Sequence, residues 1–172
     1  QRIVERAGCD PDRFDGLIGV YAGMGNNFYY FHNVSTRPEF LHMVGEVQAE
    51  IGREKDHVAT LVSHKLNLTG PSLSVHTACS TGLVCIDSAV QSLLSRQCDV
   101  ALAGAIELRT PQMSGQIHEP SGIFTGDGHC RPFSSDASGT MFSDGAGVLV
   151  LKRLSDAIED GDMEKLLKLA GE

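Results

Sequence analysis

Short apolar runs alternate along this chain with segments whose apolar residues recur at three- and four-residue spacing. The segments expected to form strands are 16–22, 73–76, 100–106 and 147–152. The segments expected to form helices are 40–51, 58–66 and 83–94. This alternation favours an α/β layered fold with a largely parallel sheet, and the continuous apolar run at 100–106 is typical of a strand covered on both faces.

Bulk properties narrow the class of protein. With 172 residues and 41% hydrophobic content, the chain can bury one hydrophobic core, which indicates one domain or a piece of one. A net charge of −8 without a Lys/Arg cluster argues against a nucleic-acid or anionic-membrane surface. Five irregularly spaced cysteines do not suggest a disulfide framework, so we expect a reducing compartment, the cytoplasm. No apolar run approaches the ~20 residues of a membrane span, and the start is too charged for a signal peptide.

Cys79 lies between the strand-like segment 73–76 and the helix-like segment 83–94. At such a turn, free N–H groups and the positive end of a helix dipole favour a thiolate and can hold a developing oxyanion. The small neighbours Ala78, Ser80 and Gly82 leave room for a substrate. The pattern alone also fits a small buried hydrophobic residue, which is what most free cysteines are.

The remaining cysteines and histidines are weaker candidates. Cys9, Cys85, Cys98 and Cys130 are expected to be structural or incidental, and no Cys-x-x-Cys is present, which argues against zinc. His76 is three residues before Cys79 and would point to the opposite face of a strand. The two histidines that remain as candidate bases approaching the turn are His118 and His129.

The segment 110–139 is rich in Gly, Pro and Ser and has little periodicity, so we expect a long functional loop. Its two aspartates, Asp127 and Asp136, and the later Asp144 are interpreted as turn-formers that bond to backbone rather than as paired acids. Ser155 is expected to cap a short helix that ends near Gly161.

Phosphate-binding and hydrolase motifs find little support. Gly23-Met24-Gly25 resembles the start of a dinucleotide fingerprint, but Phe28 replaces its third glycine. The sequence contains no P-loop and no Gly-x-Ser-x-Gly.

Several ordered motifs resemble the ketosynthase domains of modular polyketide synthases, which are β-ketoacyl synthases. The turn Thr77-Ala78-Cys79-Ser80-Thr81-Gly82-Leu83 resembles their active-site turn. The other matching segments, in the same order, are 65–72, 98–104, 127–133 and 145–154. The likeness runs from about Ala7 to Asp162.

The resemblance implies a thiolase-like layered fold (αβαβα), present here in part as one mostly buried mixed or parallel sheet with helices. It implies a β-ketoacyl-[acyl-carrier-protein] synthase type acyltransferase, usually a homodimer, that performs decarboxylative Claisen condensation. Cys79 would be the nucleophile, and its backbone N–H would form half of the oxyanion hole. Met141 and Phe142 match a segment that lines the acyl pocket. Substrates would arrive on the phosphopantetheine of an acyl carrier protein, with no cofactor or metal bound by this segment.

The sequence also departs from the family pattern. The motifs His-Gly-Thr-Gly-Thr and Asn-Ile-Gly-His, which carry the family's histidines, do not occur, so no histidine here inherits a role in decarboxylation. His64 stands where tyrosine is common, and Ser143-Asp144 replaces the more usual Gly-Glu. The sequence of residues 163–169 predicts a helix where the family has a strand.

We therefore interpret residues 1–172 as a fragment of a β-ketoacyl synthase N-terminal domain, the nucleophile half, without its C-terminal partner half. We expect it in isolation to be inactive and to self-associate through unburied apolar surface. The alternatives are a biosynthetic thiolase, a stand-alone fatty-acid ketosynthase, and a non-condensing domain that binds carrier proteins.

Overall fold

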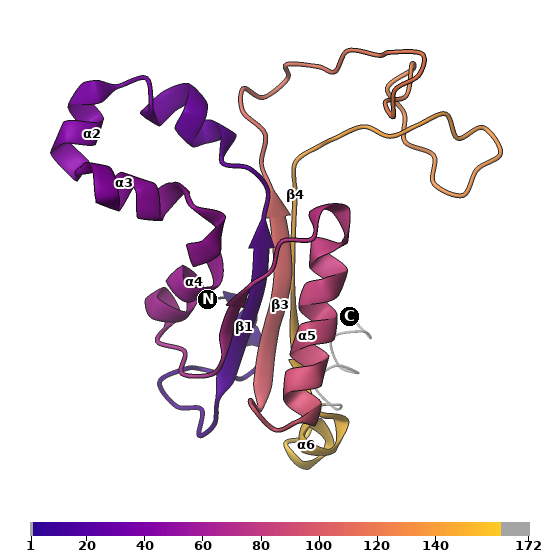
Figure 1. The fold of residues 1–172 in the computed structure, drawn as a ribbon. Coiled ribbons are helices and arrows are strands. Elements are labelled where there is room, and N and C mark those ends of the chain that lie inside the picture. Colours follow the sequence, from indigo (N-terminus) through magenta and orange to yellow (C-terminus); the bar gives the residue numbers. More distant parts are fainter. Residues whose placement is uncertain (1, 163–172) are drawn as a thin grey trace.

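One four-stranded sheet organises the computed structural model, which describes residues 2–162 (Figure 1). The strands lie in the order β2-β1-β3-β4. Their bounds are β1 Ile18–Met24, β2 Ser72–Ser74, β3 Val100–Glu107 and β4 Gly145–Lys152. β1 pairs in parallel with β2 and β3, whereas β4 runs antiparallel to β3. All four expected strands are present, and the α/β fold with a mixed sheet is confirmed.

Helices connect and cover these strands. In the described part of the chain they are α1 Arg2–Arg6, α2 Pro38–Val44, α3 Glu46–Arg53, α4 Val58–Leu66, α5 Thr81–Leu94 and α6 Leu154–Glu159. Three further helical turns are η1 Tyr30–Val34, η2 Lys55–His57 and η3 Ala78–Ser80. Within residues 2–162, no helix combines the length and the apolar character that crossing a membrane requires.

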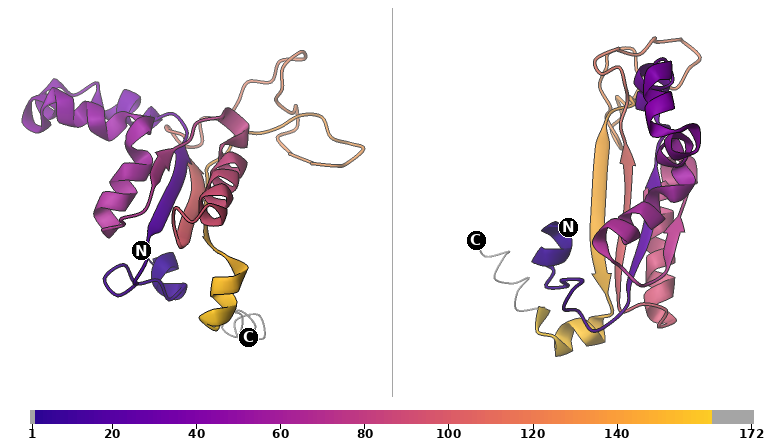
Figure 2. Two further views of the ribbon diagram at one scale, coloured as in Figure 1. Left: turned by 60° about the horizontal axis from the view of Figure 1, so that its bottom comes forward. Right: turned by 90° about the vertical axis from the view of Figure 1, so that its left-hand side faces the viewer.

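β3 lies at the centre of two hydrophobic clusters. Val100 and Leu102 belong to the first cluster, whereas Ala101 and Ala103 belong to the second. Successive side chains of a strand point to opposite faces, so the two clusters lie on opposite sides of the sheet. The first cluster includes residues of α1 and α4, and the second includes residues of α5; Figure 2 shows α1 and α5 on opposite sides. The start of β3 is therefore covered on both faces, as its sequence predicts.

β4 is an edge strand that pairs only with β3. Val148 and Leu149 are 48% and 49% exposed. The expectation of a mostly buried sheet therefore does not hold for β4. An exposed apolar edge favours association with other chains, so this surface supports the expected self-association of residues 1–172 in isolation.

The segment 40–51 forms two helices rather than the single predicted helix. Gly45 separates α2 from α3 with a φ of +88°, a backbone conformation that suits glycine and interrupts a helix. Neither helix has a buried residue, and Val47 is 71% exposed. Apolar spacing alone did not reveal this break, because the spacing continues across the glycine.

α6 begins differently from the prediction. Arg153 precedes the helix in an extended conformation, and the Ser155 hydroxyl donates to Asp156 Oδ1 at 2.8 Å instead of capping the helix. The predicted glycine end is confirmed, since Gly161 has a φ of +70° and donates its N–H to Ile158 O at 3.1 Å. The predicted helix-forming segment 163–169 lies outside the described residues.

The Arg153 guanidinium contacts the end of α5, the two residues before β3 and the first turn of α6. It donates to Leu93 O at 3.0 Å and to Cys98 O at 2.6 Å. It also pairs at 2.6 Å with both Asp99 and Asp156. Only 11% of its side chain is exposed, so these four acceptors replace nearly all of its solvation.

We expect Arg153→Ala to lower the free energy of unfolding by about 2 kcal/mol, because it leaves two carbonyls and two carboxylates without their shared donor. Urea unfolding followed by circular dichroism measures this, at concentrations where wild type and variant give the same size-exclusion profile. Arg153→Lys should fall between them, since an ammonium has the charge but not the forked geometry. An unchanged midpoint in Arg153→Ala would contradict the assignment.

Asp99 makes this network sensitive to acid. Its pKa is held below the usual value, first by the Leu17 N–H at 2.9 Å and then by Arg153. A carboxyl whose pKa is lower in the folded state stabilises fully above its unfolded pKa, about 3.9, and less as pH falls through the folded value. The stability difference between wild type and Asp99→Asn should therefore be constant near pH 7 and shrink below about pH 4. Urea unfolding across this range tests the sign.

Candidate active site

The chain turns sharply between β2 and α5. Val75 donates its N–H to Ala22 O at 2.9 Å, which continues the pairing of β2 with β1. Ala78 then adopts a φ of +53°, a left-handed conformation that costs a residue with a Cβ about 1–2 kcal/mol. Cys79 follows within η3, directly before α5. The predicted position of Cys79 on a strand-to-helix turn is confirmed, and the turn is strained in the manner of a nucleophile elbow.

Burial separates the five free cysteines into two groups. Cys79 and Cys130 are exposed, whereas Cys9, Cys85 and Cys98 are buried. Burial raises the pKa of the Cys85 thiol, which disfavours its reactive thiolate. The interpretation of Cys79 as a small buried hydrophobic residue is therefore wrong, and Cys130 provides an exposed thiol outside the turn for comparison.

Three hydroxyl groups hold the turn at Cys79. Thr81 Oγ1 accepts a hydrogen bond from Thr77 N at 3.0 Å and donates one to Ala78 O at 2.8 Å. Ser80 Oγ donates to Thr77 O at 2.8 Å and lies 3.0 Å from Thr77 Oγ1. The backbone on both sides of the strained residue is thus tied to side chains at the start of α5.

Gly23, on β1, provides the space that this turn occupies. A Cβ added there would overlap the methyl carbon of Thr81 and the carbonyl oxygen of Val75. A Cβ on Gly25 would likewise overlap the carboxylate of Glu107. The Val75 carbonyl belongs to the backbone and cannot move aside cheaply, whereas the Glu107 carboxylate is the end of a flexible side chain. Close packing therefore accounts for Gly23, the first glycine of the Gly-x-Gly pattern, without a dinucleotide fingerprint.

The candidate histidines make their hydrogen bonds away from the turn. His76 is exposed and lies beyond the end of β2. His118 Nδ1 lies 2.9 Å from Phe124 O, and His129 Nδ1 lies 2.8 Å from Asp127 O. Within the part of the chain that the structure describes, no hydrogen bond or ion pair connects any of these imidazoles to Cys79. The structure therefore does not assign a base to the thiol.

The segment between β3 and β4 contains no helix or strand among its described residues, as predicted for 110–139. Asp127 organises one turn of it: its carboxylate accepts from Thr125 Oγ1 at 2.6 Å and from His129 N at 3.1 Å, and pairs with Arg131 at 2.8 Å. These partners, the Thr125 hydroxyl first, hold the pKa of Asp127 far below its usual range. The interpretation of Asp127 as a turn-former is confirmed.

The other two acidic residues differ from that interpretation. The Asp136 carboxylate accepts from the neighbouring Ser135 hydroxyl at 3.4 Å rather than from backbone. Asp144 does accept from backbone, but from Arg109 N at 2.7 Å, which is 35 residues away. It also accepts from Gln112 Nε2 at 3.0 Å. Asp144 therefore bridges the two ends of the long segment instead of forming a local turn.

Met141 and Phe142 border a cavity of about 650 Å³. Its remaining walls come from the segment after β1, the segment after β3 and the residues before β4, and include Phe28, Arg109, Met113 and Gln116. The Arg109 guanidinium lies 4.5 Å from the ring centre of Phe142 and 5.7 Å from that of Phe28. Gln116 bonds to the backbone N–H and carbonyl of Phe142 at 3.3 and 3.0 Å. Aromatic, thioether and guanidinium groups thus make a partly apolar wall.

The turn at Cys79 and this cavity lie at the same end of the sheet. β1, β2 and β3 are parallel, and the turn follows β2 while the cavity walls follow β1 and β3. Figure 1 shows the start of α5 and the long segment together at that end. The carboxyl ends of parallel strands are where α/β sheets bind ligands. Cys79 itself is not among the cavity's lining residues.

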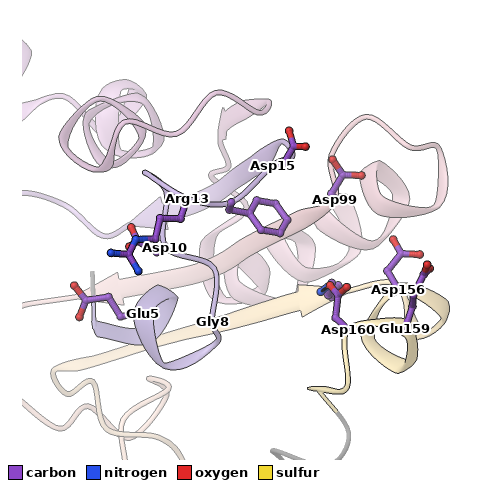
Figure 3. A pocket seen from close by; sticks show the side chains of 11 residues that line it. Glu5, Gly8, Asp10, Arg13, Asp15, Asp99, Asp156, Glu159 and Asp160 are labelled. Atoms are coloured by element: carbon purple, nitrogen blue, oxygen red, sulfur yellow. Dashed lines mark hydrogen bonds and ion pairs between the residues drawn. The ribbon is translucent and has the colours of Figure 1, made fainter.

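A second hollow, of about 690 Å³, lies at the opposite end of the sheet and is strongly acidic. Figure 3 shows Glu5, Asp10 and Asp15 from the N-terminal segment with Asp99, Asp156, Glu159 and Asp160. Lys152 lies within it and pairs with Asp160 and Asp162. Among residues 2–162, no group of three or more histidine, cysteine or acidic side chains is placed to hold a metal ion.

Comparison with known proteins identifies the family. Residues 1–157 match the family described as Beta-ketoacyl synthase, N-terminal domain. The chain belongs to the β-ketoacyl synthase family. This ketosynthase chain is 42% identical over 165 residues to a phenolphthiocerol/phthiocerol polyketide synthase of Mycobacterium tuberculosis, covering 92% of the chain and 11% of that protein. It is 38% identical over 156 residues to mycoketide-CoA synthase of the same species, covering 90% of the chain and 4% of that protein.

Solved ketosynthase structures are similar as well. Ketosynthase twelve of the bacillaene polyketide synthase from Bacillus amyloliquefaciens matches with a TM-score of 0.70 and 35% identity, over 84% of this chain and 25% of that one. An oxazolomycin ketosynthase domain from Streptomyces albus matches with a TM-score of 0.67 and 27% identity, over 91% and 26%. The resemblance to polyketide-synthase ketosynthases is confirmed. The chain spans about a tenth of the first relative and about a quarter of each solved chain.

Sequence reasoning missed the supporting residues of the site. Thr81 and Gly23 were not singled out for the turn, because their contact joins α5 to a strand 58 residues earlier in the chain. The positive φ of Ala78 carried no sequence signal, since glycine or asparagine would have been the usual marker. Arg109 was likewise missed, although an arginine two residues after the end of a strand could have been noted.

Proposed function

We propose that this chain carries the nucleophile of a polyketide-synthase ketosynthase domain and acts as an acyltransferase in chain elongation. The observation that carries the proposal is the exposed thiol of Cys79 on a strained turn at the start of α5. Family membership gives that thiol its expected chemistry.

In the first step the Cys79 thiolate attacks the carbonyl carbon of an acyl–phosphopantetheine thioester. A new thioester to Cys79 forms, the old carbon–sulfur bond breaks, and the phosphopantetheine thiolate leaves and takes up a proton. A thioester suits this role because it acylates readily and remains a good leaving group for the next step.

In the second step a malonyl-type extender on an acyl carrier protein loses carbon dioxide. The electron pair of the broken carbon–carbon bond forms an enolate, whose carbon attacks the acyl group on Cys79. The Cys79 thiolate leaves, and the product is a β-ketoacyl chain, longer by two backbone carbons, on the carrier protein. The acyl carrier protein is therefore the proposed partner, and a homodimer the proposed assembly.

The backbone N–H of Cys79 is the proposed donor to the developing oxyanion. Two features support this: the N–H lies at the start of a helix, where N–H groups lack intrahelical acceptors, and the backbone hydrogen bonds of the turn run from Ser80 to Thr77 rather than from Cys79. Preorganised donors of this kind typically contribute about 10²–10³-fold in rate.

Met141 and Phe142 are the proposed residues for acyl-chain binding. Support comes from the cavity they border, its partly apolar wall and its position at the same end of the sheet as Cys79. An apolar wall favours an acyl chain because burying each CH₂ contributes about 0.8 kcal/mol.

A condensation assay on the full-length protein tests the function. Butyryl-N-acetylcysteamine supplies the acyl group, and malonyl–acyl carrier protein supplies the extender. The expected result is a β-ketoacyl carrier protein, detected by intact-protein mass spectrometry, with release of carbon dioxide. Acylation of Cys79 without condensation would instead favour a non-condensing domain that holds or passes acyl chains. Absence of acylation would overturn the proposal.

A further inference from the structure

We infer that Thr81 is a positioning residue that sets the direction of the Cys79 backbone N–H. The inference rests on the proposed function, in which that N–H meets the oxyanion. Thr81 does not touch the substrate in this account; it acts through the peptide group between Ala78 and Cys79.

The hydrogen bond from Thr81 Oγ1 to Ala78 O is the first step of the argument. At 2.8 Å, it acts together with the Thr81 backbone N–H, which also donates to Ala78 O, to fix the carbonyl of the peptide group whose N–H belongs to Cys79. A peptide group is planar, and its C=O and N–H point in opposite directions. Holding the carbonyl of Ala78 therefore also aims the N–H of Cys79.

The same hydroxyl braces the other side of the strained residue. Thr81 Oγ1 accepts from Thr77 N at 3.0 Å, so one oxygen spans the left-handed turn at Ala78 from both sides. The Ser80 hydroxyl donates a hydrogen bond to Thr77 O at 2.8 Å. Strained conformations persist only where their surroundings over-determine them, and these three bonds supply that constraint.

Gly23 determines which way the Thr81 side chain points. The Thr81 methyl lies in the space that a Gly23 side chain would occupy. A β-branched side chain has few allowed χ1 rotamers, so placing the methyl against β1 directs the hydroxyl toward the turn. The sheet, the helix start and the Cys79 peptide are connected through this one side chain.

Two variants separate the hydroxyl from the methyl. Thr81→Val retains the branched shape and the backbone N–H bond to Ala78 O but removes both hydrogen bonds of the hydroxyl, whereas Thr81→Ser retains the hydroxyl and removes the methyl. Thr60→Val is the matched control, since Thr60 also donates to a backbone carbonyl, that of His57 at 3.1 Å, but in the first turn of α4. All variants are made in the full-length protein and checked for folding by circular dichroism.

Two readouts distinguish positioning from simple stability. Acyl transfer from butyryl-N-acetylcysteamine needs the oxyanion donor, whereas alkylation of Cys79 by iodoacetamide needs only the thiol. We expect Thr81→Val to slow acyl transfer about 10–100-fold with alkylation changed less than about threefold. The rate of acyl transfer in Thr81→Ser should lie within about threefold of wild type. Thr60→Val should transfer acyl groups at the wild-type rate.

Several outcomes overturn the inference. Wild-type acyl transfer in folded Thr81→Val would do so, as would a loss in Thr81→Ser equal to that in Thr81→Val. If Thr81→Val does not fold, Thr81→Ala and Thr81→Ser form a pair that differs only in the hydroxyl, and equal rates in the two would overturn it. A protein in which Cys79→Ala still transfers acyl groups would refute the proposed function itself, whatever Thr81 does.

Discussion

Replacing Cys79 by alanine is expected to reduce acyl transfer by three orders of magnitude or more, because no other exposed thiol lies at a helix start in the described part of the chain. The fold should remain, since the side chain is exposed and its Sγ makes no hydrogen bond or ion pair among residues 2–162. Acyl transfer from butyryl-N-acetylcysteamine tests the loss of activity, and the thermal midpoint of unfolding, measured on the same preparation, tests whether the fold remains.

Cys130→Ala is the matched control for this prediction. Cys130 is also exposed and lies in the long segment, 3.9 Å from Thr140 Oγ1, so removing its thiol should leave acyl transfer unchanged. Cys79→Ser should be almost as inactive as Cys79→Ala, because a serine hydroxyl is a much weaker nucleophile than a thiolate, and no described histidine is hydrogen-bonded to this position. Equal loss of activity in Cys79→Ala and Cys130→Ala would contradict the assignment of the nucleophile.

The second large effect is expected at Gly23. A Cβ there would overlap the Val75 carbonyl and the Thr81 methyl, and a backbone carbonyl cannot move aside cheaply. We expect Gly23→Ala to lower the free energy of unfolding by about 3 kcal/mol and to slow acylation of Cys79 more than tenfold, because the turn is displaced. Urea unfolding and single-turnover acylation measure the two effects.

Gly52→Ala is the control for Gly23→Ala. Gly52 lies in α3 with no atom within 4 Å of an added Cβ, so the same chemical change meets open space. Alanine is the better helix former, and the variant should be as stable as wild type or up to about 1 kcal/mol more stable. If Gly23→Ala behaved like Gly52→Ala, the packing of the turn against β1 would be refuted.

The spacing of apolar residues predicted most helices and strands of the fold. It failed where the conformation of a single residue ends or interrupts an element. The apolar run at 100–106 forms β3, one of the two inner strands, and 58–66 matched α4 residue for residue. The segment 40–51 broke at Gly45, because apolar spacing does not register a positive φ. Nor does a period of two carry strand direction, so the antiparallel pairing of β4 and its exposed face were not predicted.

The candidate site shows the same division between local and distant information. Cys79 could be placed on its turn because the strand and helix patterns on either side are local. The orientation of the Thr81 hydroxyl toward Ala78 O depends on a tertiary contact. In that contact the Thr81 methyl, at the start of α5, packs against Gly23 on β1. Arg109, between the rings of Phe28 and Phe142, depends on three segments meeting beyond the sheet.

The most direct test of the account is to map the acyl group after a single turnover. The full-length protein is incubated with butyryl-N-acetylcysteamine, quenched in acid, digested and analysed by mass spectrometry, with Cys130 as the internal exposed thiol. The account predicts one butyryl group, on the peptide that contains Cys79, with Cys130 unmodified. A butyryl group on Cys130, or equal labelling of both cysteines, would contradict it.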